Sequence, residues 1–230
     1  MAPKVDPGHL SCVSVSNSAF RAVFWDFGGV ILESPFDAFL RYEAEHGLPA
    51  GFLRSVNAVN PDSNAWARLE RNDISPADFD AVFHAESEAL GHAVPGSAVL
   101  ALLAGAVRPH MVEALDTVKA AGYKMACLTN NVVGGDKKTS DRAREVEAIM
   151  ARFDAVIESS KVGCRKPETA FYEIACSTLD VAPHECVFLD DLGINLKPAA
   201  AMGMHTIKVI DSHEALRALG EALGLALSHT

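Results

Sequence analysis

Polar side chains with complementary chemistry follow four apolar runs of the sequence. They comprise carboxylates, a hydroxyl, a carboxamide and an ammonium group: Asp26, Thr129, Asn130, Lys166, Asp190 and Asp191. The apolar runs have the length and composition of buried strands. Because ligands bind beyond the carboxyl ends of the strands in open parallel sheets, we expect these side chains to face one crevice.

Clustered carboxylates beside one ammonium group suit the chemistry of phosphoryl groups. Carboxylates at close quarters repel one another unless a divalent cation lies between them, and Mg²⁺ prefers a few carboxylate oxygens plus water. Lys166 and the Thr129 hydroxyl would hold the phosphoryl oxygens and stabilise the charge that develops on them. An aspartate at such a site can attack phosphorus and form an aspartyl-phosphate.

The elements that position these residues alternate between strand and helix. After the first apolar run, strands are predicted over 123–129, 153–158, 185–190 and 204–210, with helices over roughly 138–151, 168–178 and 195–201. Asp211 with Glu214 is expected to cap a last helix. This alternation predicts an α/β protein with a three-layer, Rossmann-like parallel sheet covered by helices on both faces.

One stretch departs from the alternation, because its apolar residues recur only at helical spacing and it contains no convincing strand. Within it, Ser75 followed by Pro76 is typical of a helix start. The sequence therefore predicts a polar tail over 1–19, a core over 20–34 and 107–230, and an inserted α-helical cap over 35–106.

The composition excludes several classes of function. With 49% hydrophobic and 22% charged residues, the chain has ample material for a core, and its terminal stretches are too short or too polar to span a membrane. A formal charge of -10 with scattered basic residues disfavours nucleic acid as a partner. Widely spaced cysteines and a start without secretory features favour a cytoplasmic location. We expect a monomer or homodimer that binds a small phosphorylated metabolite.

Four stretches of the chain resemble, in order, the motifs of the haloacid dehalogenase (HAD) superfamily. They are VFWDFGGVIL at 23–32, CLTNN at 127–131, ESSKVGCRKPETAFYE at 158–173 and VFLDDLGINLKPAAAMGM at 187–204. The last two resemble most closely the phosphatase-like amino-terminal domain of soluble epoxide hydrolase and its stand-alone relatives. The resemblance covers residues 21–210, with the helical stretch where this family carries its cap.

The resemblance implies a role for each candidate residue and Mg²⁺ as the cofactor. It makes Asp26 the nucleophile and a metal ligand, Lys166 the cation that binds phosphate and orients the nucleophile, and Thr129 and Asn130 substrate-binding residues. Asp191 would bind the metal directly, with the Gly28 carbonyl as a further ligand and Asp190 supporting or coordinating through water. Asn195 would buttress the loop that follows the acidic pair.

One position departs from the family pattern. Gly28 stands where phosphatases of the family usually have a second aspartate, which serves as general acid and base. Glycine still supplies a carbonyl ligand but cannot transfer a proton, and general acid-base catalysis is typically worth about 10²–10⁴ in rate. Glu33, seven residues from Asp26, is a candidate substitute.

Other interpretations stay open at this point. The chain could be a metal-free hydrolase of the 2-haloacid dehalogenase type, although those enzymes do not need the retained acidic pair. It could also be a catalytically weakened binding or regulatory domain, for which Gly28 is the best support. Taken singly, Asp26 could be a turn residue, and Lys166 could be a solvated turn residue. Arg165 is interpreted as a surface residue.

Overall fold

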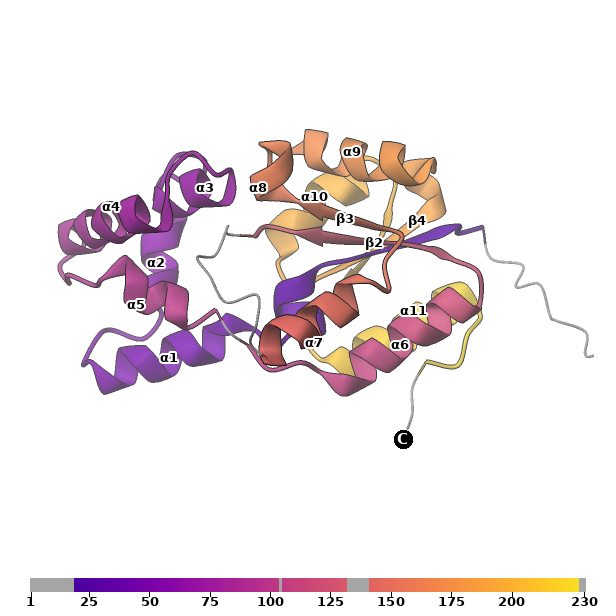
Figure 1. Cartoon of the computed structure of the whole chain (residues 1–230), viewed down its shortest axis with the longest axis horizontal. Helices are drawn as coiled ribbons and strands as arrows, with labels where there is room; N and C mark the ends of the chain where they lie inside the picture. Colours follow the sequence, from indigo (N-terminus) through magenta and orange to yellow (C-terminus); the bar gives the residue numbers. More distant parts are fainter. Residues whose placement is uncertain (1–18, 104, 132–140, 228–230) are drawn as a thin grey trace, which may run out of the picture.

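The computed structural model describes residues 19–103, 105–131 and 141–227 of the chain. These residues contain a five-stranded parallel sheet in the order β3-β2-β1-β4-β5 (Figure 1). The strands are β1 (Ala22–Trp25), β2 (Lys124–Thr129), β3 (Ala155–Glu158), β4 (Cys186–Asp190) and β5 (His205–Lys208). The predicted parallel α/β fold is therefore confirmed. The predicted tail up to residue 18, and the first residues of the helix predicted from 138, lie outside the described residues.

Helices cover both faces of the sheet and complete the three layers (Figure 1). One face packs against α6 (Pro109–Ala120), α7 (Asp141–Met150) and α11 (Ser212–Leu223), and the other against α9 (Thr169–Leu179) and α10 (Gly193–Ala201). In β1, Val23 and Trp25 belong to the first apolar cluster, whereas Ala22 and Phe24 belong to the second. Side chains alternate between the faces of a strand, so a strand covered on both faces is apolar throughout.

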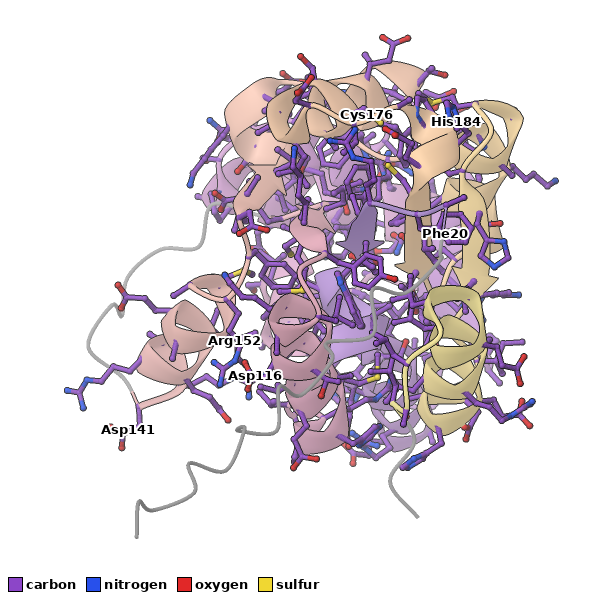
Figure 2. The ribbon with its side chains drawn as sticks, turned by 90° about the vertical axis from the view of Figure 1, so that its right-hand side faces the viewer. Phe20, Asp116, Asp141, Arg152, Cys176 and His184 are labelled. Carbon is purple, nitrogen blue, oxygen red and sulfur yellow. The ribbon has the colours of Figure 1, made fainter. Side chains whose placement is uncertain are left out.

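The last helix on the first face begins where the sequence indicates. The Asp211 carboxylate accepts a hydrogen bond from the Glu214 amide at 2.9 Å at the start of α11, which confirms the predicted cap. Arg152, just after α7, donates from Nε to Asp116 Oδ1 of α6 at 2.9 Å (Figure 2). Both side chains are substantially exposed, so this ion pair contributes about 0–1 kcal/mol.

Five helices lie between the first strand and α6, beside the carboxyl ends of the strands (Figure 1). They are α1 (Pro35–Glu45), α2 (Phe52–Ala58), α3 (Ala65–Glu70), α4 (Pro76–Ala89) and α5 (Gly96–Ala101), together called the helical segment below. Ser75 caps the start of α4, as predicted, and it forms a reciprocal capping box with Asp78. The helical segment has its own apolar cluster, in which Trp66 packs edge-on against Phe79 and Phe83.

Three short elements escaped the sequence analysis. They are a turn over Phe27–Ile31 (η1), the helix α8 (Ser159–Val162) and a 3-10 turn over Pro183–Glu185 (η2). Each is too short to show a hydrophobic period, so no pattern predicts it. Among the described residues, no helix combines the length and apolarity needed to cross a membrane.

Candidate active site

Three carboxylates meet at the carboxyl ends of two neighbouring strands. Asp26 directly follows β1, Asp190 ends β4, and Asp191 follows it. The two strands pair in parallel, so their ends lie at the same edge of the sheet. One oxygen from each of the three side chains lies within 4.8 Å of the others. Hard cations such as Mg²⁺ prefer this donor set, so the residues present fit a divalent metal ion.

Lys166 lies between two of these carboxylates and is buried. Its Nζ is 2.8 Å from Asp26 Oδ1 and 2.7 Å from Asp190 Oδ2, and its side chain is 1% exposed. Burial by itself lowers the pKa of Lys166, but the charges of Asp190 and Asp26 outweigh burial and raise this pKa above its usual value. Burial raises the pKa of Asp26, and Lys166 opposes that rise. Lys166 is therefore buried between two carboxylates and is not a solvated turn residue.

Asp190 is fully engaged by the protein, whereas Asp191 is not. Asp190 Oδ1 accepts from the Leu192 amide at 2.8 Å and from Asn195 Nδ2 at 3.0 Å. Its Oδ2 accepts from Lys166 at 2.7 Å. Asp191 Oδ2 accepts a long bond of 3.4 Å from the Ser34 hydroxyl, a contact that the sequence did not indicate. Burial, followed by the charge of Asp190, raises the pKa of Asp191 to about 6.

The two glycines after Asp26 have different roles. Gly28 is exposed with φ -71° and ψ 135°, and a Cβ added there would meet no atom within 4 Å. Gly29 has φ 76°, and a Cβ there would lie 2.2 Å from Asp191 Oδ2. The chain therefore needs glycine at 29 for both backbone conformation and space, whereas residue 28 accepts a side chain. Arg108 donates to the Gly29 carbonyl at 2.8 Å and holds this turn, which no local sequence pattern indicates.

The two residues at the end of β2 differ in how the protein uses them. Thr129 is buried at 7% exposure, and its hydroxyl has no hydrogen-bond partner among the described residues. Asn130 Oδ1 accepts from the Lys166 amide at 2.9 Å, and Nδ2 donates to the Lys166 carbonyl at 3.0 Å. Nδ2 also donates to Glu70 Oε2 of α3 at 3.2 Å. The Asn130 side chain thus binds the backbone of Lys166, a role that the sequence analysis did not consider.

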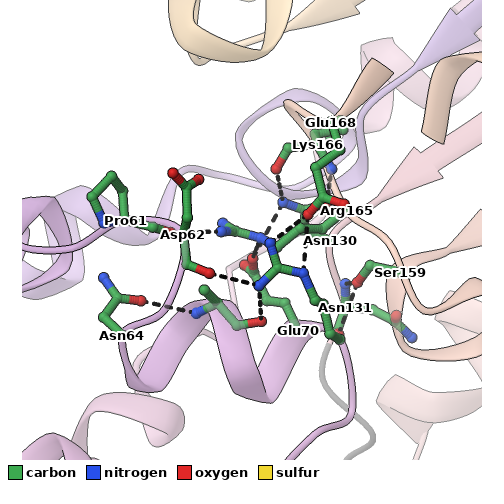
Figure 3. Close-up of polar contacts among 12 residues, drawn as sticks. Pro61, Asp62, Asn64, Glu70, Asn130, Asn131, Ser159, Arg165, Lys166 and Glu168 are labelled. Carbon is green, nitrogen blue, oxygen red and sulfur yellow. Dashed lines mark hydrogen bonds and ion pairs between the residues drawn. The ribbon is translucent and has the colours of Figure 1, made fainter. Parts of the chain in front are cut away.

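The structure also tests two residues beside the motifs, Arg165 and Glu33. Arg165, interpreted as a surface residue, is only 16% exposed and pairs with Glu70 (Figure 3). That interpretation is wrong, because Glu70 of α3 lies against the Arg165 side chain. Glu70 is far away in the sequence, so the residues next to Arg165 do not indicate this partner. Glu33 is exposed, and no hydrogen bond or ion pair in the described part of the chain joins its side chain to Asp26.

Fold and site together define a class of protein: a three-layer protein with a parallel sheet, whose strand ends present a carboxylate cluster and a buried lysine. The family model of haloacid dehalogenase-like hydrolases matches residues 20–203. The match covers most of the chain, which therefore belongs to this family, as its four motifs indicated.

Curated relatives align with nearly the whole chain. Acyl-CoA dehydrogenase family member 10 of Mus musculus is 32% identical over 96% of this chain, which spans 21% of that protein. Bifunctional epoxide hydrolase 2 of Sus scrofa is 31% identical over 92% of this chain, which spans 40% of that protein. A sesquiterpene phosphatase of Aspergillus oryzae is 26% identical, covering 90% of this chain and 98% of its own. The chain thus spans less than half of the first two relatives.

Solved structures share the fold at low sequence identity. A dehalogenase in an intermediate complex has a TM-score of 0.63 at 19% identity, covering 91% of this chain and 99% of its own. A HAD family enzyme of Bacteroides thetaiotaomicron in complex with magnesium and inorganic phosphate has a TM-score of 0.52 at 18% identity, covering 82% and 93%. These similarities establish the HAD-like architecture.

Proposed function

We propose that this hydrolase is a Mg²⁺-dependent phosphatase that cleaves a small phosphorylated metabolite through an aspartyl-phosphate on Asp26. The observation that carries the proposal is the cluster of Asp26, Asp190 and Asp191 with Lys166 between two of them. One lysine does not balance the charge of three carboxylates at the carboxyl ends of the strands. The remaining negative charge suits a divalent cation, which in turn can bind an anionic ligand.

Hydrogen bonds orient the proposed nucleophile. Asp26 Oδ1 accepts from the Phe27 amide at 2.6 Å and from Lys166 at 2.8 Å, which leaves Oδ2 without a partner among the described residues. Oδ2 would supply the electron pair for the new bond to phosphorus, while the bond to the departing alcohol oxygen breaks. Lys166 and the Thr129 hydroxyl would bind the oxygens of the phosphoryl group in transfer. Water would then hydrolyse the aspartyl-phosphate and restore Asp26.

The metal would be held by Asp26, Asp191 and the Gly28 carbonyl. Asp190, whose two oxygens already accept bonds from Lys166, Asn195 and a backbone amide, would hold the lysine and support the metal ligands. When bound, Mg²⁺ supplies positive charge that screens the attacking carboxylate from the anionic phosphate. The helical segment would serve as the cap over the site and select the substrate.

Phosphatases and dehalogenases both occur among the similar proteins, and the residues of the site favour a phosphatase. One relative is named a phosphatase, and one structural neighbour holds magnesium and phosphate. Another neighbour is a dehalogenase. A 2-haloacid brings a carboxylate that needs a cation, yet Arg71 and Arg165 beside the site both pair with glutamates. Asp190 would hold Lys166 in either reaction, whereas Asp191 is better suited to binding a metal ion than to a metal-free reaction.

The experiment is a screen for phosphate release from aryl, acyl and alkyl phosphates, with Mg²⁺ or with excess EDTA. We expect release only with Mg²⁺, and none above background from Asp26→Asn, which keeps the shape of the side chain but removes the nucleophile. Halide release from 2-haloacids that survives EDTA would instead support the dehalogenase type. Retention of more than a few per cent of activity by a folded Asp26→Asn protein would refute the covalent mechanism.

Gly28 favours one second candidate, a phosphate-binding domain that does not turn over its ligand. The site would then keep the metal ligands and Lys166 but lack the group that protonates a poor leaving group. Mg²⁺-dependent binding of a phosphate ester, measured by calorimetry and followed by recovery of the intact ester after long incubation, would support this candidate. Release of inorganic phosphate in the same sample would exclude it.

A further inference from the structure

The geometry points to Glu70, at the end of α3, as a positioning residue for Lys166. Glu70 belongs to the helical segment, whereas Lys166 belongs to the loop after α8, so the two lie in different parts of the fold. We propose that Glu70 fixes the Lys166 backbone by holding two residues: Asn130, which binds that backbone, and Arg165, which precedes Lys166 in the sequence. The function of the lysine would thereby depend on where the helical segment lies.

The first contact joins Glu70 to Lys166 through the side chain of Asn130. Its carboxamide binds both backbone groups of Lys166, accepting from N–H at 2.9 Å and donating to C=O at 3.0 Å. The same Nδ2 donates to Glu70 Oε2 at 3.2 Å (Figure 3). A carboxamide flipped or rotated away from this position loses all three bonds, so the glutamate acceptor selects the orientation that holds Lys166.

The second contact runs through Arg165, the neighbour of Lys166 in the chain. Arg165 Nε lies 2.5 Å from the same Glu70 Oε2, and the two side chains are 16% and 15% exposed. Arg165 also donates to the Pro61 carbonyl at 3.1 Å, so its guanidinium lies against the helical segment on two sides. Burial raises the pKa of Glu70, and the Arg165 charge counters that rise. A charged pair at this depth is stable only while both partners stay together.

A neighbouring contact provides a comparison. Arg71, the next residue after Glu70, donates from Nε to Glu168 Oε1 at 3.0 Å and also joins the helical segment to the loop after Lys166. No described hydrogen bond connects Arg71 or Glu168 side chains to Asn130. The Arg71 pair can therefore fasten the two parts together, but only Glu70 also holds the residue that binds the lysine backbone.

The inference deepens the proposed phosphatase function and rests on it for its catalytic meaning. Lys166 Nζ must lie within hydrogen-bond distance of both Asp26 and Asp190, and small displacements of a positioned group cost large factors in rate. Movement of α3 away from the sheet would remove the Glu70 acceptor and loosen the lysine. Substrate-dependent closure of the helical segment would in this way complete the site.

The deciding measurement is backbone hydrogen exchange of the Lys166 amide by NMR, in the full chain without substrate. The amides of Val187 and Leu189 in β4 serve as internal references for global stability. We expect Glu70→Ala to speed exchange at Lys166 at least tenfold relative to the β4 amides. The matched control Arg71→Ala, which removes the neighbouring ion pair, is expected to leave that ratio within about threefold of wild type. Glu70→Gln keeps an acceptor for Asn130 and should preserve most of the protection.

Equal changes in Glu70→Ala and Arg71→Ala, or no change at Lys166 in either, would overturn the proposal. Should Glu70→Ala not fold, Glu70→Asp gives the same comparison, since it keeps the negative charge but its shorter side chain withdraws the oxygen that contacts both Asn130 and Arg165. With a phosphate ester that is turned over, Glu70→Ala should lower kcat at least tenfold with KM within threefold, and Arg71→Ala should not. Absence of turnover in wild type would count against the proposed function alone, because the exchange measurement needs no activity.

Discussion

Restoring a carboxylic acid at position 28 tests whether its absence limits the chemistry. Gly28 has φ -71° and ψ 135°, an ordinary extended conformation, and no atom lies within 4 Å of an added Cβ. Gly28→Asp should therefore fold without strain. Replacing a glycine whose conformation suits any residue typically stabilises a protein by about 0.4–1 kcal/mol through the unfolded chain. We expect a Tm no lower than that of wild type.

The expected catalytic effect depends on the leaving group. Without a positioned acid, the rate of wild type should fall steeply as the pKa of the leaving alcohol rises, so that aryl and acyl phosphates react far better than alkyl phosphates. Gly28→Asp should flatten this dependence and speed the cleavage of alkyl phosphates tenfold or more, which corresponds to about 1.4 kcal/mol of barrier. Activated esters, which need no protonation, should change little.

The assay is a plot of log kcat/KM against leaving-group pKa for a series of phosphate esters at saturating Mg²⁺. Gly28→Asn is the matched control, since it has the same shape as aspartate but cannot donate an acidic proton. Equal slopes for wild type and a stable Gly28→Asp protein would refute the reasoning and show that acid catalysis comes from elsewhere. Glu33→Gln would then be the next variant to measure.

Four further predictions concern other residues of the site. Asp191→Asn should raise the Mg²⁺ concentration needed for half-maximal activity by tenfold or more, and an unchanged requirement would make Asp191 structural. Because the pKa of Asp191 is raised to about 6, protons compete with the metal below that pH, so the wild-type Mg²⁺ requirement should increase between pH 7 and pH 5. Lys166→Met leaves Asp26 and Asp190 buried without a counter-charge and should lower the free energy of unfolding by about 3–5 kcal/mol, as measured by urea titration. Lys166→Met combined with Asp190→Asn should recover part of that loss. The lack of any recovery would contradict the electrostatic argument. Gly29→Ala should cost at least about 1 kcal/mol from the positive φ alone, and wild-type stability of this variant would show that the turn adapts.

The contrast between Gly28 and Gly29 illustrates how tertiary contacts divide two identical residues. Both stand in the same motif, and no local sequence pattern shows which of the two positions requires glycine. The positive φ of Gly29 and the approach of Asp191, whose Oδ2 lies 2.2 Å from where a Cβ at residue 29 would stand, separate a position that must be glycine from one that accepts a side chain. The carboxylate comes from the end of another strand, so its distance depends on how the strands pair.

Much of the fold could be read from the sequence because its signals are local. Strands buried on both faces are apolar throughout, and the last helix begins at a recognisable cap, Asp211. Parallel pairing then brings the strand ends to one edge of the sheet. The meeting of Asp26 with Asp190 and Asp191 follows from that rule without knowledge of any contact.

Only the tertiary structure determines which residues from distant parts of the chain contact one another. Arg165 changes from a surface residue to a largely buried one because Glu70 of α3 lies against it, and Arg108 holds the Gly29 turn from beyond the helical segment. Asn130 and Lys166 are also far apart in the sequence, and only the packing of the elements brings the Asn130 side chain to the Lys166 backbone. A hydrogen bond or ion pair between residues far apart leaves no periodic trace in the sequence, since it depends on the packing of whole elements and not on the conformation of either residue.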